Sequence, residues 1–183
     1  MRWFISDLHF GHKNIIDYCS RPFQTAEEMD QAMMVQWNMT IHPSDHVYVV
    51  GDVTFHSPMK TDEILSQLNG RKHLILGNHD YDKKKVKGSL KKHFVTIEES
   101  ATLLIEGVNR NAHMFHFPLF GRDKPKIMIH GHSHNYRPLV TTYETTGQLL
   151  INVSVENIEY TPISETRIAD FIKQHEDFLR GGV

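Results

Sequence analysis

The sequence has little cysteine, no long apolar run and no strong net charge, and each absence excludes a class of protein. Cys19 is the single cysteine, so an intramolecular disulfide is impossible and a reducing compartment, the cytoplasm, is expected. No apolar stretch is long enough to cross a bilayer, and residues 1–7 lack the pattern of a signal peptide, so no membrane partner is expected. A net charge of −2 at pH 7 argues against an overall field that attracts nucleic acid or membranes.

The chain also lacks linkers, internal repeats and low-complexity segments. Its 183 residues, 39% hydrophobic and 23% charged, are enough for one domain with a substantial core. We therefore expect a single domain over residues 1–183. Histidine is what the chain has in excess, at 14 residues. Many of these histidines lie in pairs just after predicted strands, which is not the pattern of scattered packing or surface residues.

The first part of the chain alternates predicted strands and helices, which indicates parallel strands joined by crossovers. A helix is predicted to begin after Thr25, because Thr25 and Glu28 form a capping-box pattern. A second helix is predicted over residues 61–68, just before Asn69-Gly70. Short apolar runs predict strands over residues 2–6, 47–50 and 74–76.

The second part of the chain is predicted to be mainly β-structure, closed by an amphipathic helix over residues 164–179. Hairpin turns are predicted at residues 109–111 and 145–147. The overall pattern indicates an α/β protein, and two sheets packed face to face with flanking helices would accommodate it. Six strand-like runs follow one another, over residues 94–98, 102–108, 112–117, 126–129, 139–143 and 148–153.

Residue types that bind metals follow five separate apolar runs. In Asp7-x-His9 and in His132-x-His134, residues two apart in extended chain share a face, so each pair can hold one ion. Asp52 follows a glycine, and its carboxylate can bridge two cations. Oxygen and nitrogen ligands without cysteine suit Mn²⁺, Fe, Zn²⁺, Ni²⁺ or Co²⁺ better than a thiolate zinc site, and several imidazoles disfavour Mg²⁺. The candidates are Asp7, His9, Asp52, Asn78, His79, Asp80, His116, His132 and His134.

These motifs occur together and in a fixed order, and as a set they resemble the calcineurin-like metallophosphoesterase superfamily. The flanking segments 7–12, 21–23 and 152–155 are similar to a small single-domain bacterial and phage-type subgroup. The resemblance implies a four-layer α/β/β/α sandwich of two mixed β-sheets flanked by helices, and two divalent metal ions, with Mn²⁺ the first expectation. The motifs are Asp7-x-His9, Gly51-Asp52, Gly77-Asn78-His79-Asp80, His116 and Gly131-His132-x-His134.

The resemblance also implies a role for each matching residue. His79 would act on the leaving-group oxygen as a general acid or charge stabiliser, and Asp80 would orient His79. His116 is preferred to His113 as a ligand, because His116-Phe117-Pro118 matches the His-x-Pro pattern of the family. The first metal would be held by Asp7, His9, Asp52 and His134, and the second by Asp52, Asn78, His116 and His132, with Asp52 bridging the two.

Three further features near these motifs bear on the substrate. His12 could contact a substrate phosphate or be an ordinary loop histidine, and both readings stay open. Arg21 could bind a phosphate or lie on the surface against Phe23. Residues 83–92 are rich in lysine and could attract a polyanion or form a solvated face. No aromatic residues alternate with these lysines, so a stacking platform for single strands is not indicated.

The leading functional prediction is therefore a metal-dependent phosphoesterase that works by in-line attack of a metal-bridging hydroxide. The chain has no obvious room for a cap domain, so an open site is expected. An open site favours phosphodiesters of the nucleotide or cyclic nucleotide type, with nucleic-acid ends also possible.

The alternative is a phosphomonoesterase or phosphoprotein phosphatase, because both activities use the same ligand set. A non-catalytic scaffold, as in a retromer subunit of this superfamily, is the third hypothesis, and the intact ligand set argues against it. The sequence leaves the natural substrate and the oligomeric state open.

Overall fold

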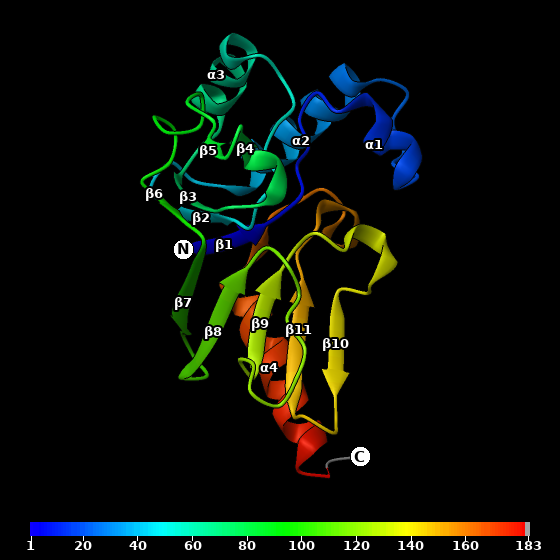
Figure 1. The fold of residues 1–183 in the computed structure, drawn as a ribbon. Coiled ribbons are helices and arrows are strands. Elements are labelled where there is room, and N and C mark those ends of the chain that lie inside the picture. The colour runs from blue at the N-terminus through cyan, green and yellow to red at the C-terminus, as the bar shows by residue number, and fades with distance from the viewer. Residues whose placement is uncertain (182–183) are drawn as a thin grey trace.

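Two five-stranded β-sheets form the centre of the computed structural model, which describes residues 1–181 (Figure 1). The first sheet has the strand order β12-β1-β2-β3-β6, and the second has the order β10-β11-β9-β8-β7. Both sheets are mixed, because β12 runs antiparallel to β1, while β7 and β10 run antiparallel to their neighbours. The first sheet comprises β1 (Arg2–Ile5), β2 (His46–Val49), β3 (Arg71–Ile75), β6 (Thr96–Glu98) and β12 (Ile163–Ser164). The second comprises β7 (Ser100–Ile105), β8 (Arg110–Phe115), β9 (Ile127–His130), β10 (Val140–Tyr143) and β11 (Gln148–Asn152).

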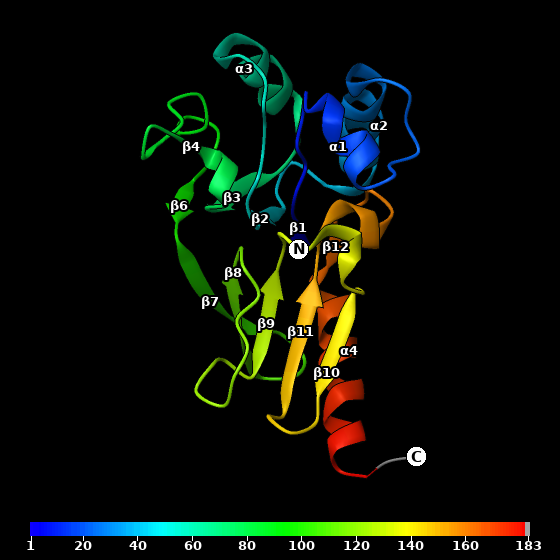
Figure 2. The ribbon, with the colours of Figure 1, turned by 45° about the vertical axis from the view of Figure 1, so that its right-hand side comes forward.

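Helices flank both sheets. Figure 1 shows α1, α2 and α3 on the side of the first sheet that faces away from the second sheet, and Figures 1 and 2 both show α4 behind the second sheet. A small hairpin of β4 (Tyr81–Asp82) and β5 (Lys85–Val86) stands apart from both sheets. The helices are α1 (Lys13–Tyr18), α2 (Ala26–Thr40), α3 (Pro58–Gln67) and α4 (Glu165–Leu179), and the 3₁₀ turns are η1 (Asn78–Asp80), η2 (His134–Tyr136) and η3 (Val155–Ile158).

Two hydrophobic clusters hold these layers together, and the alternation of side chains along the strands separates them. In β3, Leu74 belongs to the cluster that α1, α2 and α3 cover, whereas the next residue, Ile75, belongs to the other cluster. Ile75 shares that second cluster with Met114 of the second sheet and Ile168 of α4. The expected α/β fold, with two mixed sheets flanked by helices, is therefore confirmed.

Several boundaries differ from the sequence-based expectation, and two of the differences have a clear local cause. The helix expected at 61–68 begins earlier, at Pro58, because the Ser57 side chain caps it and proline is well suited to the first helical turn. The hairpin turn expected at 109–111 lies at residues 106–109, where Gly107 and Asn109 take positive φ angles of 80° and 52°. The cap at Thr25 is confirmed, since its side chain accepts a hydrogen bond from the N–H of Glu28.

The fold brings several strand ends to one place. Parallel neighbours β1, β2 and β3 end at the same edge of the first sheet, so the loops that follow them lie side by side. A parallel bridge between Ser6 and Ser154 joins this edge to the end of β11 in the second sheet. None of the helices in residues 1–181 is long and apolar enough to cross a membrane.

Candidate metal centre

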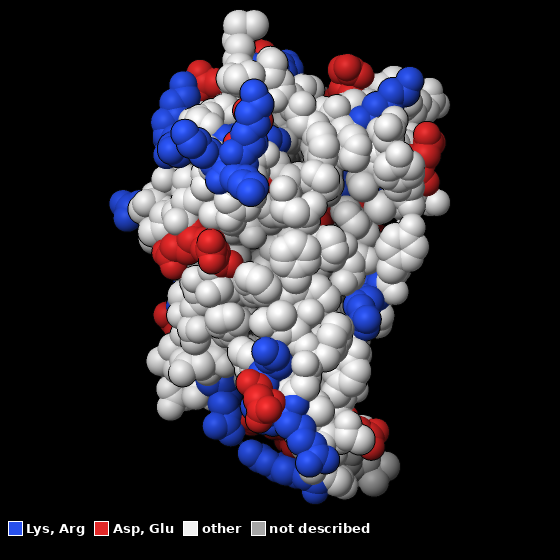
Figure 3. Space-filling view, viewed as in Figure 1, with Lys and Arg blue, Asp and Glu red and all other residues white. Residues whose placement is uncertain are grey.

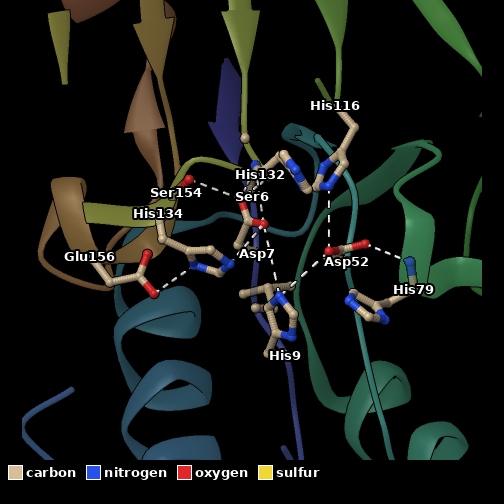
Figure 4. A network of polar contacts seen from close by, with 12 residues as sticks. Ser6, Asp7, His9, Asp52, His79, His116, His132, His134, Ser154 and Glu156 are labelled. Carbon is tan, nitrogen blue, oxygen red and sulfur yellow. Dashed lines mark hydrogen bonds and ion pairs between the residues drawn. The ribbon is translucent and has the colours of Figure 1, made fainter. Parts of the chain in front are cut away.

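Side chains from five loops converge where the two sheets meet (Figure 4). The Oδ2 atom of Asp52 lies 3.5 Å from His9 Nε2 and 3.4 Å from His116 Nε2. The Oδ1 atom of Asp7 lies 3.8 Å from His9 Nε2 and 3.7 Å from His134 Nε2. Separations of this size suit donor atoms that share one cation, because first-row metal ions bind nitrogen and oxygen at about 2.0–2.2 Å.

The donor atoms form two groups that share one residue. Asp7, His9 and His134 each offer a ligand atom within 4.8 Å of the others, and so do Asp7, Asp52 and His116. The Nε2 atoms of His9 and His116 are buried and have no hydrogen-bond partner among the residues described. A buried polar atom without a partner carries a desolvation cost, which a bound cation would remove. The residues present therefore fit two divalent metal ions.

The backbone is strained at five of the seven predicted metal ligands. The five values of φ are 58° at Asp7, 51° at His9, 58° at Asp52, 62° at His132 and 42° at His134. Residues other than glycine rarely adopt backbone angles in this left-handed region. Each such residue lowers the stability of the fold by on the order of 1–3 kcal/mol. Strain of this kind persists only where surrounding contacts enforce it, and it concentrates at functional sites.

Asp7 is held from three directions. Its Oδ2 atom accepts hydrogen bonds from Ser6 Oγ at 2.7 Å, from Ser154 Oγ at 2.9 Å and from the N–H of His132 at 3.0 Å. Burial would raise the pKa of Asp7, but its contact with His9 and the charges of nearby histidines hold this pKa far below the usual value. The carboxylate is therefore ionised and fixed in place.

Two glycines of the motifs are needed because side chains approach them closely. A Cβ atom at Gly131 would collide with Ser6 Oγ and Asp7 Oδ2, and one at Gly77 would collide with the carboxylate of Asp52. The glycines before the candidate ligands therefore make room for the carboxylates of neighbouring loops.

Asp80 ties two ligand loops together. Its Oδ2 atom accepts hydrogen bonds from the N–H groups of Gly77 and Asp52, and its Oδ1 atom accepts one from Val53. None of the hydrogen bonds described for Asp80 within residues 1–181 goes to the ring of His79, so the expected role of Asp80 in orienting His79 remains a prediction. Asp80 instead faces back along η1 towards Gly77, as a residue in a capping box does.

His79 lies at the edge of the cluster, beside Asp52 (Figure 4). Its N–H group donates to Asp52 Oδ1 at 2.8 Å, and its half-buried ring packs against Phe55 with the ring centroids 4.8 Å apart. The His132 ring contacts the His116 ring, with centroids 5.2 Å apart. Asn78 is exposed at the start of η1, and its amide remains a predicted ligand.

His12 also lies beside the cluster. Its ring stacks on Phe55 with centroids 4.0 Å apart, and its Nδ1 atom lies 3.2 Å from His9 Nδ1. Burial and the nearby imidazoles of His9 and His79 lower the pKa of His12 to about 4, so its ring is neutral at pH 7. The structure thus brings His12 to the edge of the site, where contact with substrate remains a proposal.

The sequence left two roles open for Arg21, a phosphate ligand or a surface residue against Phe23, and the structure shows neither. Its side chain is buried, and both Nε and Nη2 donate to Glu156 Oε1, at 2.9 and 2.7 Å. The guanidinium also donates to the backbone carbonyls of Asp7 and Leu8. Arg21 therefore binds the backbone of the first ligand loop to Glu156.

Glu156 is a functional candidate that the sequence did not indicate. Its Oε1 atom lies 3.0 Å from His134 Nδ1, so it orients the ring with Nε2 towards Asp7. Burial raises the pKa of Glu156, but the hydrogen bond to His134 and the charge of Arg21 lower this pKa by more, so the net shift is downward. A carboxylate bonded to the second nitrogen of a metal-binding imidazole is a common support for such ligands.

Replacing Glu156 with Gln is expected to weaken binding of the first metal by roughly 10- to 100-fold, the usual effect of losing such a support. The amide keeps the size of the side chain but removes the charge that orients His134 and balances Arg21. Calorimetric titration with Mn²⁺ measures the affinity, and Glu159→Gln, at an exposed position three residues on, is the control. An unchanged Mn²⁺ affinity in Glu156→Gln would show that His134 is oriented without Glu156.

Comparisons with known proteins identify the family of the chain. Residues 2–154 match the family model of the calcineurin-like phosphoesterase superfamily domain, a superfamily of hydrolytic phosphoesterases that typically bind two divalent metals. The uncharacterized protein MJ1445 of Methanocaldococcus jannaschii is 34% identical over 176 residues, covering 94% of this chain and 91% of that protein. The gene 66 protein of Mycobacterium phage L5 is 30% identical over 160 residues, covering 73% of this chain and 77% of that protein. The crystal structure of AQ665, a protein of unknown function from Aquifex aeolicus, matches with a TM-score of 0.72 at 27% identity, covering 93% of this chain and 98% of that one. The chain therefore belongs to the calcineurin-like phosphoesterase superfamily.

Proposed function

We propose that the protein is a phosphoesterase that depends on two metal ions and prefers phosphodiesters. The observation that carries this proposal is the pair of donor groups sharing Asp7, in which the Nε2 atoms of His9 and His116 are buried without a partner. Asp52 Oδ2 lies between these two nitrogens, which supports a bridging role for Asp52. The proposed ligands are Asp7, His9, Asp52 and His134 for one ion, and Asp52, Asn78, His116 and His132 for the other.

The residues of the chain divide the chemical work. A bound metal pair would supply a nucleophile from water and neutralise charge on the phosphoryl oxygens. We assign to His79 the proton that is given to the leaving-group oxygen, because its backbone N–H donates to Asp52 and its ring packs against Phe55 and His9. Asp80 keeps the loops of Asp52 and Gly77 at a fixed separation.

An open site supports the preference for diesters. Phe55, next to His79, is 39% exposed, and Tyr18, next to His12, is 63% exposed, so substituents on both sides of a phosphate have room. A phosphomonoesterase or phosphoprotein phosphatase is the alternative, because it would use the same ligands. We further propose Mn²⁺ as the metal, with Fe, Zn²⁺, Ni²⁺ and Co²⁺ as alternatives, a cytoplasmic location, and a single domain over residues 1–183.

The test compares bis-p-nitrophenyl phosphate, a diester, with p-nitrophenyl phosphate, a monoester, using the protein loaded with Mn²⁺. We expect faster hydrolysis of the diester, and loss of both activities when EDTA removes the metal. A preference for the monoester would replace the phosphodiesterase with the phosphatase. No hydrolysis of either compound by protein with two bound metals would favour a non-catalytic scaffold.

A further inference from the structure

A lysine-rich hairpin directly follows the turn that carries His79. The lysine hairpin, residues 81–87, consists of β4, a two-residue loop, β5 and Lys87. Figure 3 shows a group of basic side chains on the face of the molecule where Figure 1 places β4 and β5. The overall charge of the chain is −2, so this concentration of cations is local. The cations of the hairpin are Lys83, Lys84, Lys85 and Lys87.

Three of these four lysines line a pocket. A pocket of about 900 Å³ is lined by Lys83, Lys85 and Lys87, with Asp82 the single acidic residue in its wall. Pockets of this size hold ligands larger than one phosphate group. Within residues 1–181, no carboxylate lies within 4.0 Å of the ammonium groups of the hairpin, whereas Lys92 is paired with Asp62 at 2.6 Å. The hairpin charges are therefore available to an anion from outside.

The loop of the hairpin is built at a conformational cost. Lys83 and Lys84 have φ angles of 46° and 68°, and a two-residue loop with both φ positive is normally made by Asn-Gly or Asp-Gly. Lysine is disfavoured in this region, so the turn sequence is poor for folding. Two lysines therefore occupy positions where lysine is unfavourable, and such strain concentrates at functional sites.

The hairpin contacts residues that adjoin the candidate metal centre. Lys87 Nζ donates to the carbonyl of Thr54 at 2.6 Å and lies 5.3 Å from the centroid of the Phe55 ring. Phe55 in turn contacts the rings of His12 and His79. Lys87 of the basic pocket and the proposed catalytic histidine therefore both contact the same aromatic ring.

Exposed aromatic rings surround the same edge. Phe55 is 39% exposed, Tyr18 is 63% exposed and Tyr136 is 79% exposed. Tyr136 Oη donates to the carbonyl of Tyr18, and the Tyr18 ring meets that of His12 edge-on. Rings of this kind stack on nucleobases. The sequence showed no such rings among the lysines, because they come from three other segments of the chain.

We propose that the lysine hairpin binds the backbone phosphates of a single-stranded nucleic acid, whose bases stack on the exposed rings while one phosphodiester lies at the metal centre. This assignment rests on the proposed function, since it names the substrate of that site. A single-stranded nucleic acid supplies a row of phosphates for the lysines and a row of bases for the aromatic rings. A phosphoprotein supplies neither row. DNA and RNA share this chemistry.

The test uses fluorescence anisotropy with the Mn²⁺-loaded protein and labelled oligo(dT) and oligo(U) probes of about 12 nucleotides. Probe integrity is checked on a gel afterwards. The variant Lys83→Asn with Lys84→Gly removes two charges and installs the preferred turn sequence, so it is expected to fold at least as well. We expect its Kd to rise about tenfold, and the slope of log K against log salt to fall by roughly 1.4, as for two lost phosphate contacts.

Lys124→Gln with Lys173→Gln, two exposed lysines outside the pocket, is the matched control and is expected to bind as the wild type does. A probe of equal length without bases is expected to bind more weakly, by roughly 5- to 150-fold in Kd per stacked base. Wild-type affinity in the hairpin variant would contradict phosphate binding by the lysine hairpin. Equal binding of the baseless probe would contradict stacking of bases on the exposed rings, and with it the proposal that the ligand is a nucleic-acid strand. Tighter binding of oligo(dT) or of oligo(U) assigns DNA or RNA. Failure of the p-nitrophenyl assay with normal oligonucleotide binding would contradict the proposed function alone.

Discussion

The Asp52→Asn variant is expected to hydrolyse the diester roughly a hundred- to a thousandfold more slowly than the wild type, and to bind less metal. Asp52 Oδ2 lies 3.5 Å from His9 Nε2 and 3.4 Å from His116 Nε2, so it is the oxygen that both donor groups have in reach. Asparagine has the same shape but carries no charge, and one of its two ends is an NH₂ group that cannot bind a cation. Since Oδ1 accepts a hydrogen bond from the N–H of His79, the remaining oxygen is expected to keep that position, and the NH₂ group then replaces the oxygen shared by both proposed metals.

Two measurements separate the parts of this prediction. Steady-state kinetics give kcat/KM for the diester, and elemental analysis after gel filtration gives the number of metal ions per chain. Asp123→Asn, at an exposed position, is the control for the loss of one carboxylate. An Asp52→Asn protein with two bound metals and normal turnover would rule out Asp52 as the bridging ligand.

The sequence was informative about this site because the residues that define it sit in local patterns. Each apolar run predicts a strand, and parallel strands place the residues that follow them at a common edge. Asp7, His9, Asp52, His116 and His134 follow such runs, and the structure brings their side chains together. The fold class could be predicted for the same reason, since the alternation of strands and helices is a local property of the chain.

What the sequence did not indicate depends on contacts between distant segments. Arg21 and Glu156 lie 135 residues apart in sequence, and nothing in the spacing of either residue indicates the other. Arg21 therefore looked like a surface cation, although it is buried against Glu156 and the backbone of Asp7. The partners of Asp80 could not be predicted either. Backbone N–H groups of two loops donate to its carboxylate, and every residue type except proline has such a group, so no sequence motif marks them.

The His79→Ala variant is expected to keep both metals while its kcat on a diester with a poor leaving group falls about 10²- to 10⁴-fold, the usual contribution of a general acid. His79 touches the cluster through its backbone, which donates to Asp52 and is unaffected by the substitution. Its ring packs against Phe55 and His9 at the edge of the site, so the ring can act on a leaving group without holding a metal.

Metal content and kinetics distinguish this role from that of a ligand. Asp52→Asn loses activity together with metal, whereas His79→Ala is expected to lose activity alone. His79→Asn is the companion variant, because an amide can donate a hydrogen bond but cannot transfer a proton at neutral pH. Leaving groups of rising acidity are expected to narrow the gap between the wild type and His79→Ala, since a stable leaving group needs no proton. Near-normal turnover of a poor leaving group by fully metallated His79→Ala would show that the proton comes from elsewhere.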